Sequence, residues 1–164
     1  MTKKISWISL FVALSVIGAM IKMPALIGSV ALDIFPALVA STLFGGGVGA
    51  FIGGLGHFVS ALLGGMPLGP LHIIITLEMA LLVWLFGFLY NKGKKWASAF
   101  VFWFANAVVA PLPFLFILGP AFYLGIIPSL LVGSALNVII ALVISPKVIA
   151  RLRPGIRKEG MKHV

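Results

Sequence analysis

The chain has 164 residues, 62% of them hydrophobic, and its mean hydropathy is +1.22. Soluble domains contain about 45 to 50% apolar residues, so the composition excludes an ordinary soluble protein and indicates an integral membrane protein. The net charge is +9 at pH 7, but eleven of the twelve basic residues precede the first apolar run, follow the last one or lie in a single connection, an arrangement that argues against nucleic-acid binding.

Six apolar runs are candidates for membrane helices. A spanning helix needs about 20 residues, with a range of about 17 to 25. The second run is too short to span the membrane upright, and we expect it to begin within the preceding connection. The runs cover residues 5–21, 35–44, 48–63, 71–90, 96–118 and 122–145.

The basic residues predict the orientation of these helices. With six helices both termini lie on one side, together with Lys3, Lys4, the connection 92–95 and the stretch 147–164. Cytoplasmic loops carry an excess of Lys and Arg, so this side is predicted to be cytoplasmic. We therefore predict an all-α membrane protein: a compact six-helix bundle over residues 1–146, with cytoplasmic N and C termini, and a basic cytoplasmic tail over residues 147–164.

The connections on the predicted outer side are nearly uncharged. They cover residues 22–34, 64–70 and 118–123. Outer loops this apolar are expected to fold over a ligand and exclude water, since loops positioned by a rigid scaffold commonly carry binding residues.

Small residues recur every four positions in two of the runs. Gly45, Gly49 and Gly53 predict a stripe without side chains, against which another backbone packs closely. In the first run, Ser9 and Ala13 form one such pair, and Ser15 and Ala19 form another. This spacing indicates either packing within the bundle or docking onto a partner protein.

Ionisable residues within the apolar runs are candidates for a binding site. His57, His72 and Glu78 lie in predicted helices, where such residues are costly and usually face an interior cavity. Each could instead be a packing residue. His72 and Glu78 lie roughly 240° apart at about 100° per residue, so they should not both point straight into one narrow pocket, although adjacent faces remain possible. Asp33 either caps the following helix or contacts a ligand.

A second polar group lies in the last two runs. It comprises Trp103, Asn106, Tyr123 and Asn137, near Pro111 and Pro113. Prolines free backbone carbonyls, which a membrane protein tolerates where they line a cavity or meet other protein. The two asparagines either bind a ligand or bridge helices, and the aromatic residues either stack on a flat ligand ring or anchor the helix ends.

Motifs for catalysis and metal binding are weak. Asp33, His57, His72 and Glu78 are suitable metal ligands by type, but their spacing is not that of a metal motif, and we predict no metal site. There is no nucleophile elbow and no Walker A sequence. We expect no enzymatic activity. The alternative is a membrane-embedded enzyme that acts on a small or lipid substrate through His57, His72 and Glu78.

Taken together, the chain resembles the substrate-binding S components of energy-coupling factor (ECF) vitamin transporters. The resemblance rests on the length, the six helices, the long first outer connection with Ala31-Leu32-Asp33, the small-residue spacing in the first run, and the block 45–78. It implies a subunit of a bacterial or archaeal cytoplasmic membrane. Such a subunit binds a vitamin or precursor with the outer halves of the last three helices and with the outer loops.

The resemblance also implies partners and residue roles. The first helix would dock on a transmembrane coupling subunit driven by two ATPases, so ATP is used by the partners and this chain needs no cofactor. The family's docking pattern would fall on Ser9 and Ala13, with serine in place of the usual first alanine. The Leu32-Asp33-x-x-Pro36 loop and the Pro70-Leu71-His72 turn are most similar to the branch of pantothenate and alpha-ribazole transporters, and alpha-ribazole is the preferred ligand. The predicted substrate-binding residues are Asp33, His57, His72, Glu78, Trp103, Asn106, Tyr123 and Asn137.

Overall fold

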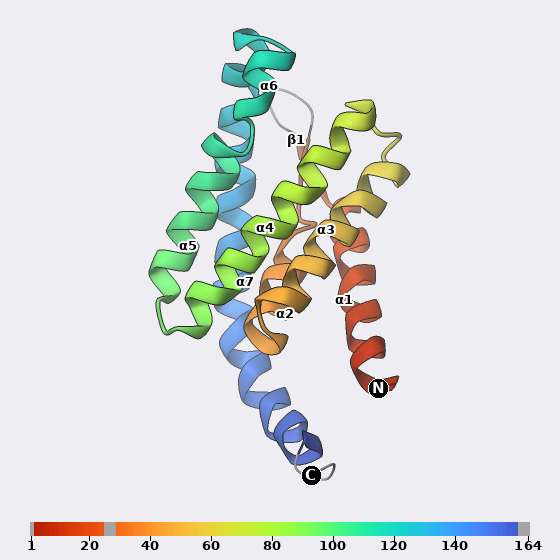
Figure 1. Cartoon of the computed structure of the whole chain (residues 1–164), viewed down its shortest axis with the longest axis vertical. Helices are drawn as coiled ribbons and strands as arrows, with labels where there is room; N and C mark the ends of the chain where they lie inside the picture. Colours follow the sequence, from red (N-terminus) through yellow and green to blue (C-terminus); the bar gives the residue numbers. More distant parts are fainter. Residues whose placement is uncertain (1, 25–28, 161–164) are drawn as a thin grey trace.

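The computed structural model describes residues 2–24 and 29–160, which form a helical bundle with one short antiparallel hairpin (Figure 1). The hairpin pairs β1 with β2, with Lys22 opposite Ala31. In chain order the elements are α1 (Thr2–Met20), β1 (Lys22–Pro24), β2 (Ser29–Ala31), α2 (Phe35–Phe44), α3 (Gly46–Leu63), the 3-10 turn η1 (Gly69–Leu71), α4 (His72–Asn91), α5 (Lys95–Phe104), the π-helical turn η2 (Ala105–Val109), α6 (Leu112–Ile117) and α7 (Pro120–Gly160).

Four helical segments are long and apolar enough to cross a membrane, and two shorter apolar helices accompany them. The long segments are Gly46–Leu63, Gly69–Asn91, Lys95–Ile117 and Pro120–Leu152, and the short ones are Ile5–Met20 and Phe35–Phe44. The prediction of a helical membrane bundle is therefore confirmed, and its six apolar runs correspond to these six segments.

Three boundaries differ from the prediction. The helix over residues 35–44 begins at Phe35 and not within the preceding connection, because that connection is occupied by the hairpin and Pro36 favours a helix start. The run 96–118 is interrupted by η2 and a turn before α6. The last helix does not end at residue 145 but continues to Gly160. Most of the predicted tail is thus helical, and residues 161–164 lie outside the described residues.

Helix α2 is the centre of the bundle. Residues 36–42 are all buried, and the helix contacts α1, α3, α4 and α7. Its two hydroxyl groups bond within the helix: Ser41 donates to the Leu38 carbonyl and Thr42 to the Val39 carbonyl, each at 2.7 Å. A ten-residue helix can stay inside the bundle because longer helices surround it and its side-chain polar groups are satisfied.

Glycines of α3 allow close packing against α2 and α4. A Cβ atom at Gly49 would overlap Ser41, and one at Gly53 would lie 2.8 Å from Val83 Cγ2. The predicted glycine stripe is therefore present at these two positions. Gly45 is not part of it: this residue forms the turn between α2 and α3 with φ of +93°, and a Cβ there would meet nothing within 4 Å.

The ends of the bundle differ in charge. The start of α1, the end of α7 and the α4–α5 turn with Lys92, Lys94 and Lys95 lie at one end (Figure 1). The connections from α3 to α4 and from α6 to α7 lie at the other end. The alternation expected for a six-helix topology is therefore observed, while the side of the membrane that each end faces remains a prediction.

Candidate ligand-binding cavity

A cavity of about 580 Å³ is lined in part by the α3–α4 connection and by α6, which lie at the end of the bundle opposite the start of α1 (Figure 1). Its walls come from the segment after β2, from α3 and α4 with their connection, and from η2, α6 and α7. Six of the eight predicted binding residues line it: Asp33, His57, His72, Glu78, Asn106 and Asn137. Much of the remaining wall is apolar, including Ile34, Met79, Phe114, Phe122 and Ile126.

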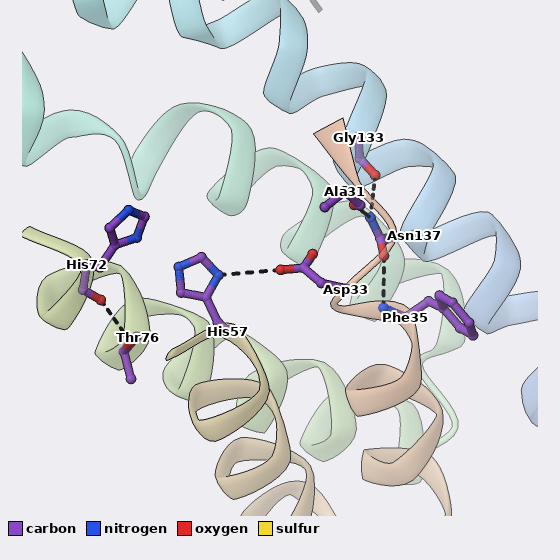
Figure 2. Close-up of polar contacts among 8 residues, drawn as sticks. All are labelled: Ala31, Asp33, Phe35, His57, His72, Thr76, Gly133 and Asn137. Carbon is purple, nitrogen blue, oxygen red and sulfur yellow. Dashed lines mark hydrogen bonds and ion pairs between the residues drawn. The ribbon is translucent and has the colours of Figure 1, made fainter. Parts of the chain in front are cut away.

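Asp33 and His57 form an ion pair across this cavity. His57 Nδ1 lies 3.5 Å from Asp33 Oδ2, and each side chain is 18% exposed. Figure 2 shows the His57 ring between Asp33 and His72. Asp33 does not cap α2, because the helix begins after Ile34 without a side-chain cap from the residues at its start. Of the two roles open to Asp33, the structure therefore excludes capping.

Asn137 of α7 fills the capping role. Its Oδ1 accepts the Phe35 amide at 2.8 Å, and its Nδ2 donates to the carbonyls of Ala31 at 3.0 Å and Gly133 at 2.9 Å (Figure 2). Only 3% of Asn137 is exposed. The side chain therefore joins α7 to the end of the hairpin and to the start of α2, and its three hydrogen bonds are all made within the protein.

His72 is buried at the start of α4, with its ring centroid 5.7 Å from that of His57. The Leu68 amide donates to His72 Nε2 at 3.4 Å. His72 Nδ1 and His57 Nε2 are both buried and have no hydrogen-bond partner. Buried polar atoms are nearly always paired, so unpaired ones in a cavity wall are candidates for ligand contacts.

Glu78 also lines the cavity, and no described residue gives it a hydrogen bond or a salt bridge. We expected that His72 and Glu78 would not both point straight into one narrow pocket, and the structure shows both of them in the wall of one wider cavity. The α4 residues in the wall are His72, Ile75, Glu78 and Met79, which span an arc of roughly 120° at about 100° per residue. The cavity is wide enough to accept that arc, so the two residues occupy adjacent faces of one site.

The π-helical turn η2 shapes the opposite wall. The Ala110 amide donates to the Ala105 carbonyl at 2.7 Å, the i to i+5 pattern of a π-helix. Asn106 in this turn lines the cavity and donates to Ser134 Oγ at 2.6 Å. Single π turns are frequent at functional sites. Of the two prolines that we expected beside a cavity or other protein, Pro111 is part of the cavity wall.

Trp103 and Tyr123 are not among the residues that line the cavity. Trp103 Nε1 donates to the Leu131 carbonyl and the Tyr123 hydroxyl donates to the Val108 carbonyl, both at 3.0 Å. These bonds join α7 to α5 and to η2. Contact of either residue with a substrate stays a prediction.

Two serines of α7 were missed from the sequence. Ser129 and Ser134 are buried and line the cavity, and Ser129 Oγ has no partner. A signal was available: Ser129, Gly133 and Asn137 are four residues apart, so on a helix they share one face. Small and polar residues with this spacing indicate an inward face.

The two small-residue pairs of α1 have different surroundings. Ser9 and Ala13 are exposed, together with Leu10, Leu14 and Ile17. Ser15 is buried against α3, where a Cβ at Gly56 would lie 2.7 Å from the Ser15 Cβ. Ser15 therefore packs within the bundle, whereas Ser9 and Ala13 lie on a free face of α1.

Comparison with known proteins gives one family. The model of the family described as "ECF transporter, substrate-specific component" matches residues 3–151, nearly the whole chain. No curated protein matches the chain significantly.

Proposed function

This chain belongs to the substrate-specific components of ECF transporters, and we propose that it captures alpha-ribazole, or as second choice pantothenate, outside the cell and delivers it inward. The family is a vitamin-type, substrate-binding transporter component and not an enzyme. It associates with an ECF module of transmembrane and ATPase subunits. The alternative of a membrane-embedded enzyme acting through His57, His72 and Glu78 is therefore set aside.

The observation that carries the proposal is the cavity itself. It has the size of a small-molecule site, since such sites enclose about 300 to 1,000 Å³ and combine apolar walls with a few convergent polar groups. Its polar groups come from α3, α4, η2 and α7, and it lies beside the nearly uncharged connections. Alpha-ribazole joins a flat aromatic ring to a sugar. The apolar residues Phe114 and Phe122 suit the ring, and the histidines, Glu78 and Ser129 suit the hydroxyl groups.

The orientation in the membrane follows from the charged end of the bundle. The positive-inside rule places the termini and the turn with Lys92, Lys94 and Lys95 in the cytoplasm. The cavity then opens towards the outside of a bacterial or archaeal cytoplasmic membrane. We assign residues 1–146 to the substrate-binding bundle and residues 147–164 to a cytoplasmic tail that is attracted to anionic lipid headgroups.

Release requires the partners. We propose that the free face of α1 with Ser9 and Ala13 docks on the transmembrane coupling subunit, because small exposed residues four apart allow close helix approach. ATP turnover in the partner subunits would then tilt the whole bundle and open the cavity to the cytoplasm. The chain itself needs no cofactor for this step.

A binding measurement tests the proposal. The purified protein in lipid nanodiscs is titrated with alpha-ribazole and, separately, with pantothenate, and heat of binding is recorded. We expect saturable binding of one of them, weakened in Asp33→Ala and His72→Ala and unchanged in Lys147→Gln, which lies far from the cavity. Absence of binding by both compounds, with no small molecule released from the denatured protein, would contradict the proposed function.

A further inference from the structure

The acidic side chains of the cavity differ in their partners of opposite charge. Asp33 and Glu78 are the two acidic residues among its described lining residues, and no lysine or arginine is among them. Asp33 is paired with His57, whereas Glu78 forms no hydrogen bond or salt bridge with a described residue and interacts with His57 electrostatically. A ligand carboxylate or phosphate would therefore enter a site with two carboxyl groups and no lysine or arginine among its described lining residues, in which both carboxyl groups interact with His57. Like charges brought together in a site of low dielectric constant repel strongly.

The hydrogen bond from the Leu68 amide determines which ring nitrogen of neutral His72 carries the proton. The Leu68 amide donates to Nε2, so Nε2 is an acceptor and the neutral imidazole carries its proton on Nδ1. Nδ1 is the atom without a partner, in a side chain that is only 7% exposed. His72 therefore has one donor to offer, and Glu78 offers only acceptors if ionised.

Ser129 adds another unpaired group on the facing wall, besides those of His57, His72 and Glu78. Its side chain is also 7% exposed, and its Oγ lacks a partner. A hydroxyl group both donates and accepts, so Ser129 can serve either kind of ligand atom. Leaving buried polar groups unpaired is costly, and a ligand that supplies matching partners removes that cost.

We infer that the ligand is recognised as an uncharged or cationic molecule, with a hydrogen-bond donor placed against Glu78 and an acceptor placed against His72 Nδ1, and not through a carboxylate or phosphate group. This inference rests on the proposed function, because it names the chemical class of the substrate of the same cavity. Of the two candidate ligands it selects the nucleoside alpha-ribazole over the anion pantothenate.

Two measurements on the full-length protein test the inference. Small molecules released by denaturing the purified protein are identified by mass spectrometry in both ion modes. The protein in nanodiscs is then titrated with alpha-ribazole and with pantothenate, as the wild type and as Glu78→Gln, His72→Phe and the control Lys147→Gln. Thermal unfolding without ligand verifies that each variant is folded.

The sign of the Glu78→Gln effect separates the outcomes. For a donor-bearing neutral ligand, loss of the carboxylate weakens binding roughly tenfold or more, since hydrogen bonds to charged groups are the strong ones. His72→Phe removes the donor and weakens binding as well. A carboxylate ligand would instead bind equally or more tightly to Glu78→Gln. Release of a carboxylate or phosphate compound, or tight binding of pantothenate, would overturn the inference while leaving the transporter function intact. Absence of any ligand would overturn both.

Discussion

The side-chain oxygen of Asn137 accepts the backbone amide of Phe35 at 2.8 Å, although the two residues are 102 positions apart in the chain. Through this bond α7 caps the first turn of the buried helix α2. The amide group of the same side chain holds the Ala31 carbonyl at the end of the hairpin. The position of Asp33, between Ala31 and Phe35, therefore depends on a residue in the last helix.

The first prediction concerns this bond. Asn137→Ala removes three hydrogen bonds, and because such bonds in membrane proteins average about 0.6 kcal/mol, we expect a loss of about 2 kcal/mol in the free energy of unfolding. Thermal unfolding in detergent measures it. The control is Ser9→Ala, which replaces an exposed polar residue by alanine and should leave the midpoint of thermal unfolding unchanged. An equal midpoint for Asn137→Ala and the wild type would show that the cap contributes nothing.

The second prediction compares two glycines of α3. A Cβ at Gly49 would lie 2.7 Å from the Ser41 Cα, whereas one at Gly47 would meet nothing within 4 Å. Gly49→Ala should therefore destabilise the protein by about 2 kcal/mol through overpacking. Gly47→Ala should be neutral or stabilising by up to about 1 kcal/mol, since alanine is the better helix former. Unfolding midpoints check both, and similar values for the two variants would contradict the packing described for α2 and α3.

The third prediction concerns the ion pair between Asp33 and His57. Both side chains are partly exposed, so the coupling should be modest, about 1 kcal/mol. A double-mutant cycle with Asp33→Asn, His57→Gln and the combined variant measures it from unfolding free energies. We expect the double variant to be less destabilised than the sum of the single ones. Strict additivity would mean that the pair does not contribute to stability.

The fourth prediction concerns orientation. The chain contains no cysteine, so single cysteines can be introduced without background labelling. Lys94→Cys in the α4–α5 turn should react with a membrane-impermeant maleimide only after the cells are opened. Leu118→Cys, 41% exposed at the other end of the bundle, should react in intact cells. The reverse pattern would place the cavity on the cytoplasmic side and exclude capture from outside.

The fifth prediction concerns docking of the partner. Ala13→Leu adds a side chain on the free face of α1, and we expect it to lower co-purification of the coupling subunit roughly tenfold, which corresponds to about 1.4 kcal/mol. Ligand binding by the isolated chain should be unchanged. Ala97→Leu makes the same change at an exposed position of α5 and should have no effect. Equal loss in both variants would argue against a specific docking face on α1.

Much of the architecture was predictable because it depends on local composition. The apolar runs predicted the helices, and the run 35–44 has the bounds of α2, although we expected that helix to begin within the preceding connection. The glycine spacing predicted close packing at Gly49 and Gly53. The ionisable residues in apolar runs predicted polar groups at a cavity. Placing such side chains in the membrane interior costs free energy, so they usually face a cavity within the protein.

The hairpin and the π-helical turn were not predictable in this way. Residues 22–24 and 29–31 are too short to show a strand pattern, and the pairing is made where β2 contacts α1 and α7. The η2 turn depends on one shifted backbone bond, from the Ala110 amide to the Ala105 carbonyl. Neither feature has a periodic signal in the sequence.

By itself the sequence determined a membrane bundle of six helices, the uneven distribution of charge between its two ends, and the residue types available to a binding site. These features follow from the length, hydropathy and charge of successive segments, which can be read from the chain without knowing how it folds. Only the tertiary structure decided that Asp33 pairs with His57, that Asn137 caps α2 in its place, and that His72 and Glu78 share one cavity. These contacts join residues from different helices, and the packing of the helices sets which polar groups meet and which remain unpaired.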